Sequence, residues 1–297
     1  MGAIGEQAAQ LQREWETNPR WAGITRTYSA RDVIRLRGDA AGEHDPARRG
    51  ASRLWDLLHR TDAAPAVGAA SIRSGWQTGD GGVVAGADAG FGPALGAFEL
   101  MTALIEAGAA GVRFEDQLSP GTDRGGKVLV PTGQHIETLT AARLAADVLG
   151  VPALIIARSG ADAASRLTSD TDERDHEFLT GERTPDGFHR VEPGWYACVT
   201  RQLEFAPYAD VLWLQTPAPD LDVARAFACI IHSQYPEKLL AYSCEAPVTD
   251  RAHEAFQHEL AALGYQFQAV PAGYPDAAEP SPESADLLAR SRGPVYA

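Results

Sequence analysis

The sequence predicts an α/β protein built around a largely parallel sheet. Short apolar segments of strand length alternate with segments in which apolar residues recur every three to four positions. This alternation is typical of βα units, which form either a closed barrel or an open doubly wound sheet. The chain has 297 residues, of which 44% are hydrophobic. That is enough for one large core, and a barrel of this class commonly uses about 250 residues.

The clearest βαβ unit lies within residues 83–132. Its first apolar run ends in a Gly-rich turn that carries Asp88, a helix is expected over 95–107, and a strand at 111–114 leads to Glu115. The carboxyl ends of parallel strands form the edge at which ligands bind. Two carboxylates at that edge predict a site for a hard cation such as Mg²⁺, which prefers oxygen ligands.

The other elements follow from the same periodicities. Helices are expected at 4–16, 30–38, 46–59, 137–149, 196–205, 220–232, 250–264 and 283–290, and strands at 64–70, 151–157, 211–214, 239–242 and 265–270. Residues 159–193 are expected to form a long surface loop, and loops of this length are commonly functional or mobile. The predicted organisation is a helical segment (1–62), an α/β barrel (63–275) and a Pro-rich tail (276–297).

The connections around the first two strands are unusually short. Only three residues separate Ala70 from Ser74, whereas a crossover between parallel strands needs about a dozen residues. Either the first two strands merge, or the barrel is incomplete or rearranged on this side.

Composition excludes several classes of function. The formal charge is −14, from 40 acidic and 26 basic residues, which disfavours binding to nucleic acid. The three cysteines, Cys198, Cys229 and Cys244, form no CxxC pair and fit reduced thiols. No apolar run reaches membrane-spanning length, and the acidic N-terminus is not a signal peptide. We therefore expect a cytoplasmic protein whose partner is a small molecule rather than nucleic acid or a membrane.

A set of motifs runs in fixed order through most of the chain: TNPRWAGITRTYSARDVIRLRG, GADAGFG, FELMTALIEAGAAGVRFEDQL, GGKVLVPT, LTSDTDERD and YADVLWLQT. Together they resemble the isocitrate lyase family of the isocitrate lyase/phosphoenolpyruvate mutase superfamily. The resemblance implies a TIM-type (β/α)8 barrel with N-terminal helices, rather than an open sheet. It also implies a homo-oligomer, either a dimer or a tetramer.

The resemblance implies roles for residues at the strand ends. Asp88 and Glu115 stand where the family has acids around its metal, so they are the expected ligands of Mg²⁺ or Mn²⁺; the alternative is a capping or loop-ordering carboxylate. Arg158 matches an arginine that contacts a substrate carboxylate, a task for which guanidinium is well suited. Arg158 could equally form a structural salt bridge with Asp88 or Glu115.

A second group of residues is expected at the small carboxylic-acid substrate. Ser74, Gly75 and Trp76 match a segment that holds the glyoxylate half of the substrate through backbone N–H groups and the Ser hydroxyl. Core packing is the alternative for Trp76. Trp213, on a strand that reaches the same edge, is also expected to contact the substrate.

One loop departs from the family pattern at its acid–base group. The family places a Lys-Lys-Cys-Gly-His signature between the positions of Leu118 and Gly125, whereas this chain reads SPGTDR there. A hydroxyl is far less acidic than a thiol, whose pKa is about 8.5, so the Ser or Thr cannot replace the Cys. Asp123 is the candidate catalytic base, with a surface-loop residue as the alternative.

Further departures surround the expected metal. The family's aspartate two residues before Asp88 is Gly86 here, its acid after the Trp213 strand is Gln215, and its His before Glu115 is Arg113. We therefore predict that the chain does not cleave isocitrate itself. The predicted function is a metal-dependent lyase that acts on a 2-oxo or 2-hydroxy acid through an enolate. The alternative is a catalytically silent homologue that binds a ligand or a partner.

Overall fold

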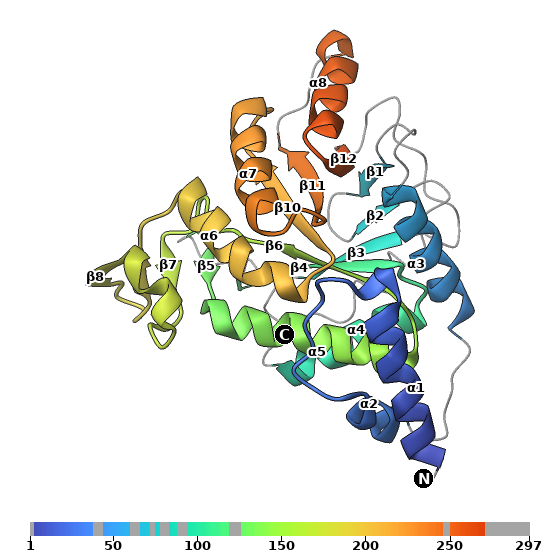
Figure 1. Ribbon diagram of the computed structural model, residues 1–297. Helices are drawn as coiled ribbons and strands as arrows, with labels where there is room; N and C mark the ends of the chain where they lie inside the picture. The colour runs from blue at the N-terminus through green and yellow to red at the C-terminus, as the bar shows by residue number, and fades with distance from the viewer. Residues whose placement is uncertain are drawn as a thin grey trace.

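The computed structural model describes residues 3–37, 44–59, 66–71, 75–77, 83–87, 94–118, 126–245 and 250–270. Eight of its strands belong to one sheet: β1 (Ala66–Ser71), β2 (Gly75–Gln77), β3 (Val83–Ala87), β4 (Gly111–Glu115), β6 (Leu154–Arg158), β10 (Val211–Thr216), β11 (Leu239–Cys244) and β12 (Tyr265–Val270). They close into a barrel in the order β1-β12-β11-β10-β6-β4-β3-β2 (Figure 1). The barrel predicted from the sequence is therefore confirmed.

The β2 strand is the irregular member of this barrel. It runs antiparallel to both neighbours, with Trp76 paired to Ala70 of β1 and to Val84 of β3, whereas the other strand pairs of the barrel are parallel. Three residues separate β1 from β2 and five separate β2 from β3. Such short connections can reverse the chain but cannot carry a parallel crossover. Of the three alternatives, the structure shows the rearranged barrel.

Helices lie around the barrel (Figure 1). They are α1 (Ala3–Thr17), α2 (Ala30–Arg37), α3 (Asp45–Leu58), α4 (Ala94–Glu106), α5 (Thr132–Leu149), α6 (Trp195–Phe205), α7 (Leu221–Gln234) and α8 (Asp250–Ala262). None of these described helices is both long and apolar enough to cross a membrane. The predicted boundaries at 62 and 275, and the helix expected at 283–290, fall outside the described residues and stay predictions.

The α5 helix begins five residues before the predicted start. Its first turn is capped by acids from far along the chain. The backbone N–H and hydroxyl of Thr132 donate to Asp175 at 2.9 and 2.6 Å, and the N–H of Gly133 donates to Asp172 at 2.5 Å. Carboxylates stabilise a helix N-terminus because its first N–H groups lack partners within the helix. A cap that lies about 40 residues away in sequence leaves no local start signal.

The segment 159–193 is not the irregular loop expected from its composition, and that prediction was wrong. It contributes β7 (Arg166–Leu167), β8 (Leu179–Arg183) and β9 (His189–Val191), which join β5 (Val128–Leu129) in a sheet of order β5-β7-β9-β8. This sheet lies to one side of the barrel in Figure 1. Its small apolar core includes Leu129, Leu167 and Phe178. Strands of two to five residues are too short to show a periodic pattern.

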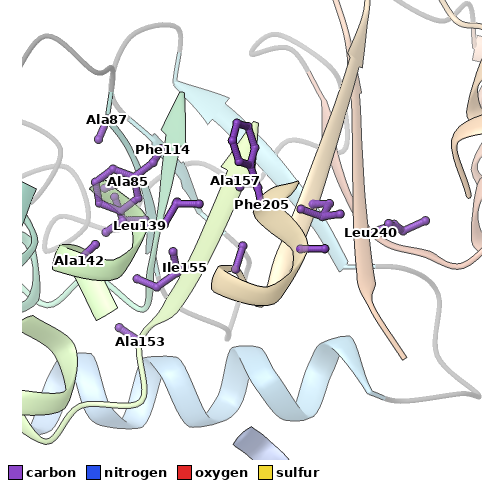
Figure 2. Close-up of a cluster of buried hydrophobic side chains, with 14 of the residues drawn as sticks. Ala85, Ala87, Phe114, Leu139, Ala142, Ala153, Ile155, Ala157, Phe205 and Leu240 are labelled. Atoms are coloured by element: carbon purple, nitrogen blue, oxygen red, sulfur yellow. The ribbon is translucent and has the colours of Figure 1, made fainter. Parts of the chain in front are cut away.

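Side chains alternate between two cores along each barrel strand, as the twofold period of a strand requires. The outward residues Val112 and Phe114 of β4 join Leu139 of α5 in the layer between strands and helices (Figure 2). The inward positions include Ile156 and Trp213, which belong to the separate cluster inside the barrel. Arg113 and Glu115 alternate with the outward residues and therefore face the barrel interior.

A buried ion cluster joins the helices to the amino end of the barrel. Asp210, just before β10, accepts hydrogen bonds from Arg20 at 2.6 Å and from the backbone N–H of Ile155 at 2.7 Å, and also pairs with Arg143. Burial alone would raise the pKa of the Asp210 carboxyl, but Arg143 and Arg20 hold it far below its usual range. The Arg20 guanidinium also lies over the ring of Trp55, at 4.0 Å.

Substitution of Asp210 by Asn should lower the free energy of unfolding by about 3–5 kcal/mol, because it leaves two buried guanidinium groups without their counter-charge. The measurement is urea unfolding followed by circular dichroism. Asp45→Asn is the matched control, since its ion pair with Arg49 spans 3.5 Å between side chains that are 66% and 64% exposed. The control should change the stability by less than about 1 kcal/mol. Equal effects of the two substitutions would contradict the role given to Asp210.

Candidate functional site

Glu115, at the carboxyl end of β4, lies between two arginines inside the barrel. One carboxylate oxygen pairs with Arg113 and the other with Arg158. The second oxygen also accepts a hydrogen bond from Gln117 Nε2 at 2.9 Å. Glu115 and Arg158 are direct partners in the β4–β6 register, and they are only 4% and 3% exposed. The structure thus shows the salt bridge that the sequence left open as the alternative for Arg158.

The electrostatics of this cluster keep Glu115 ionised. Burial alone would raise the pKa of its carboxyl, but the charges of Arg113 and Arg158 hold that pKa below its usual value. Burial by itself would likewise lower the pKa of Arg158, yet Glu115 holds it above its usual value. The three side chains therefore carry a net charge of about +1 at neutral pH, which favours an anionic ligand.

Trp213 of β10 forms the wall of this cluster. It is fully buried, and the guanidinium carbon of Arg113 lies 5.2 Å from the centre of its ring. Its indole N–H donates to Ser243 Oγ at 2.8 Å, and its ring packs against Phe267 at 5.3 Å. These contacts fix the ring, and a cation over an indole face is a favourable arrangement. The predicted substrate residue Trp213 is thus brought beside Arg113 and Arg158.

Several buried polar atoms at this edge have no hydrogen-bond partner within the described part of the chain. They are Arg158 Nε, Gln117 Oε1 and Asp162 Oδ1. Burial raises the pKa of the Asp162 carboxyl, although Lys127 and Arg158 oppose the shift. A side chain at Gly160 would collide with Gln117 Oε1. Because buried polar groups are normally hydrogen-bonded, these atoms are candidate contacts for a small polar ligand.

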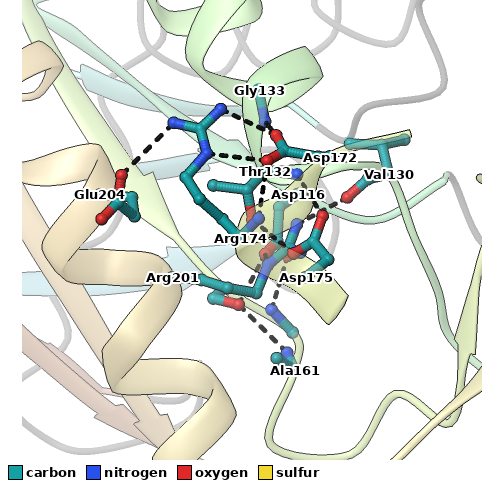
Figure 3. A network of polar contacts seen from close by, with 12 residues as sticks. Asp116, Val130, Thr132, Gly133, Ala161, Asp172, Arg174, Asp175, Arg201 and Glu204 are labelled. Atoms are coloured by element: carbon teal, nitrogen blue, oxygen red, sulfur yellow. Dashed lines mark hydrogen bonds and ion pairs between the residues drawn. The ribbon is translucent and has the colours of Figure 1, made fainter. Parts of the chain in front are cut away.

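A second polar network holds the loop that carries Asp162 (Figure 3). Asp116 accepts hydrogen bonds from Ser159 Oγ at 2.6 Å, from the N–H of Gly160 at 2.8 Å and from Arg201 Nε at 2.8 Å. The same guanidinium also donates to Asp175 at 2.5 Å. Asp116 therefore orients the loop after β6, and Arg201 ties that loop to the second sheet and to the start of α5.

The other predicted site residues are less well placed by the structure. Ser74, Asp88 and Asp123 lie outside the described residues, so their assignments stay predictions. Gly75 and Trp76 lie in β2, of which the structure describes the backbone. Their backbone pairs with Ala85 and Val84 of β3, which in turn pair with Val112 and Gly111, so both residues lie level with the start of β4, whereas Glu115 is at its carboxyl end. Their contacts with the substrate therefore stay predictions.

A divalent cation fits poorly at Glu115 in this arrangement. Both oxygens of this carboxylate already pair with guanidinium groups. Across the described ranges no three His, Cys, Asp or Glu side chains come together as a metal-binding group. Gln215, where the resemblance places an acid, is neutral and donates to Glu245 Oε1 at 3.1 Å. The described residues therefore do not provide a ligand set for Mg²⁺.

Sequence reasoning gave no function to Arg113, Gln117 and Asp162. Arg113 precedes Glu115 by two positions, so the period of a strand predicts that both face the barrel interior. That spacing was the available signal for the ion cluster. Asp162 lies only four residues after Arg158. Its position near the Arg158 side chain depends on the loop after β6, which is held by Asp116 from another strand, and no local sequence pattern reveals this contact.

Comparison with known proteins decides the family. The profile of the isocitrate lyase family matches residues 81–186 and 180–278. Isocitrate lyase 1 of Mycobacterium tuberculosis is 40% identical over 346 aligned positions, which cover 91% of this chain and 81% of that protein. The chain belongs to the isocitrate lyase family. Isocitrate lyase of Escherichia coli is 41% identical, covering 89% of this chain and 80% of its own.

These alignments also show a difference in length. The 346 aligned positions exceed the 297 residues of the chain, so the family relatives contain internal segments that this chain lacks. The short connections on both sides of β2 are consistent with such deletions. Among solved structures, a phosphonopyruvate hydrolase complex with oxalate and Mg²⁺ is 19% identical, with a TM-score of 0.42, covering 72% of this chain and 71% of its own.

His135 of α5 is a buried titratable group beside this site. It is fully buried against the ring of Phe205, at 4.6 Å, and neither ring nitrogen has a partner among the described residues. Burial lowers the pKa of its imidazole from 6.5 to about 4, while the nearby Asp116 opposes the shift. The ring is therefore neutral in the folded protein at physiological pH.

His135 should make the fold less stable in mild acid. Between pH 6.5 and pH 4 the unfolded chain binds a proton at this imidazole and the folded chain does not, so stability falls as the pH is lowered through this window. The loss is about 3 kcal/mol. His135→Leu should remove this part of the pH dependence, because it deletes the titrating ring and breaks no hydrogen bond found within the described ranges. The measurement is the free energy of unfolding at several pH values.

The exposed residue His258 provides the control for this experiment, and His258→Gln should keep the pH dependence of the unmodified chain. Buried acids that do not interact with His135, such as Asp210, contribute to the acid response equally in all three proteins, whereas Asp116 interacts with the ring and its change belongs to the effect of His135→Leu. Parallel pH curves for His135→Leu and the unmodified chain would show that His135 takes up a proton without cost to the fold.

Proposed function

We propose that the chain is a carbon–carbon lyase that acts on a small 2-oxo or 2-hydroxy carboxylic acid through an enolate-type intermediate. Membership of the isocitrate lyase family supports the reaction class. The observation that carries the proposal is Arg158, a guanidinium buried at the carboxyl edge of the barrel whose Nε has no hydrogen-bond partner among the described residues. One face of the guanidinium is held by Glu115, which leaves N–H donors in the geometry that a carboxylate recognises.

The chemistry of such a site follows from charge. In the cleavage of a 2-hydroxy acid, a base removes the hydroxyl proton, the C–O bond becomes a carbonyl and the adjacent carbon–carbon bond breaks. The electron pair of that bond remains on the second fragment as an enolate, which then takes up a proton. Fixed positive groups stabilise the developing negative charge, and Arg113 and Arg158 supply them here.

The proton transfers require an acid–base group in place of the Cys that the family uses. We keep Asp123 as the proposed base. Asp162 is a second candidate, because its carboxyl is partly buried near Arg158 and Lys127 and its raised pKa favours the protonated form that a general acid needs. Asp162→Asn and Asp123→Asn, compared in the same assay, separate the two assignments.

A ligand-binding protein without catalytic activity is the second candidate function. The double ion pair of Glu115 favours it, because a substrate carboxylate has to bind an arginine that is already partly engaged. Release of a 2-oxo acid from a 2-hydroxy acid distinguishes an enzyme from a binding protein. On the resemblance to the family we further propose a cytoplasmic homo-oligomer, either dimer or tetramer, which light scattering of the purified chain tests.

Arg158→Met should abolish turnover and weaken the binding of 2-oxo acids by about tenfold or more, because a charged hydrogen bond contributes roughly 1.5–3 kcal/mol. Arg158→Lys should recover only part of the binding, since an ammonium cannot form a bidentate contact. Turnover is measured as 2-oxo acid released from a panel of 2-hydroxy acids that includes isocitrate, and binding by calorimetry with glyoxylate and pyruvate.

Arg190→Met is the control, because this arginine is exposed on β9 in the second sheet. It should leave turnover and binding unchanged. Circular dichroism must show that each variant remains folded, since loss of Arg158 leaves Glu115 with Arg113 as its cationic partner in this cluster. Unchanged binding in a folded Arg158→Met protein would contradict the proposed site. Rapid release of glyoxylate from isocitrate would contradict the prediction that isocitrate is not the substrate.

A further inference from the structure

We infer that Arg113 occupies the place of a divalent cation beside Glu115, and that the site binds its carboxylate ligand without a metal. The inference rests on the proposed function only for the class of ligand. It concerns the positive charge at the carboxyl edge, which a protein supplies either with a bound cation or with its own side chains.

The position of Arg113 inside the barrel is the first argument. In the β3–β4 register Arg113 is the direct partner of Gly86, which has no side chain to project into the interior. The Arg113 side chain is partly buried and pairs with Glu115 Oε1, while its guanidinium carbon lies 5.2 Å from the Trp213 ring centre. A glycine on the neighbouring strand leaves room for this long side chain.

The occupancy of Glu115 is the second argument. A carboxylate that binds a hard cation directs its oxygens at the ion. Here one oxygen is directed at Arg113, and the other at Arg158 and Gln117. A cation at this carboxylate would have to displace a guanidinium and then lie close to it. Repulsion between the two positive charges opposes this, and it is strong in a buried site.

The charges of the neighbouring strands are the third argument. Gln215 extends from β10 as a neutral side chain, and Lys127 lies close enough to lower the pKa of Glu115. The three departures from the family pattern, Gly86, Gln215 and Arg113, all change the local charge in the positive direction. Together they add about +3 when a His is counted neutral, whereas Mg²⁺ carries +2. The protein therefore supplies the positive charge itself.

The ligand that fits this arrangement is a small carboxylate with a second oxygen on the adjacent carbon. One carboxylate binds the Nε side of Arg158, where the described residues provide no hydrogen-bond partner, and the neighbouring carbonyl or hydroxyl oxygen approaches Arg113. Gln117 then contributes a carbonyl oxygen that accepts a ligand hydroxyl. Oxalate is a suitable probe, because it is planar, stable and presents paired oxygens on adjacent carbons.

Calorimetric titration with oxalate tests the inference on the full-length protein. We expect the dissociation constant in EDTA to equal that in Mg²⁺ within about twofold, and Mn²⁺ alone to produce no binding signal in electron paramagnetic resonance. Binding of oxalate that requires Mg²⁺ or Mn²⁺ would overturn the inference and leave the proposed function standing. No binding of oxalate, glyoxylate or pyruvate with or without a metal would contradict both.

Two variants sharpen the test. Arg113→Met should weaken oxalate binding in EDTA by about tenfold or more, while the exposed control Arg190→Met should not change it. The triple variant Gly86→Asp, Arg113→His, Gln215→Glu restores the charge pattern of the family. It should lose oxalate binding in EDTA and regain it in Mg²⁺. If this folded variant and the unmodified chain respond to Mg²⁺ alike, Arg113 does not take the place of the cation.

Discussion

The carboxyl edge of this barrel depends on one requirement, that a carboxylate buried inside a protein must have positive partners. Removing such a charge from water costs several kcal/mol, and the cost is offset only by close ion pairs and hydrogen bonds. Two features of β4 meet the requirement for Glu115. The β4–β6 register places Arg158 directly opposite, and the twofold period of the strand places Arg113, two positions earlier, on the same face. A shift of one residue would turn these side chains into the helix layer.

The same requirement is met differently at the other end of the barrel. Around Asp210, two arginines and the N–H of Ile155 bind the carboxylate, and these contacts stabilise the amino end of the barrel. Around Glu115, by contrast, Arg158 Nε and Gln117 Oε1 remain without partners in the described part of the chain. Polar atoms that stay unpaired in a buried site reduce stability. Their presence distinguishes the edge that we propose binds the ligand from the cluster at Asp210 that stabilises the fold.

Hydrophobic periodicity is a local signal, and it predicted the alternation of strands and helices. The choice of a barrel over an open sheet came from the family resemblance carried by the ordered motifs. The sequence also showed that the segment around Trp76 could not contain a parallel crossover, since connection length limits the direction of a strand. The second sheet could not be predicted, because its strands are short. The early start of α5 depends on Asp175, which is distant in sequence. From the sequence alone, Arg113 was recognised only as a departure from the family pattern. The β3–β4 register adds that it lies directly opposite Gly86.

The departures from the family pattern become related once their positions are known. If a site loses the acids that hold a cation, a remaining Glu115 would be a buried charge without its counter-ion, a loss of roughly 3–5 kcal/mol. An arginine that reaches this carboxylate removes the penalty, and a glycine at the paired position accommodates its side chain. The identities of these residues are therefore linked. The charge of Arg113 compensates that of Glu115, and Gly86 leaves space for the Arg113 side chain. The positive charge that remains is fixed to the barrel, so the carboxylate ligand that we propose would meet charges that are already in place.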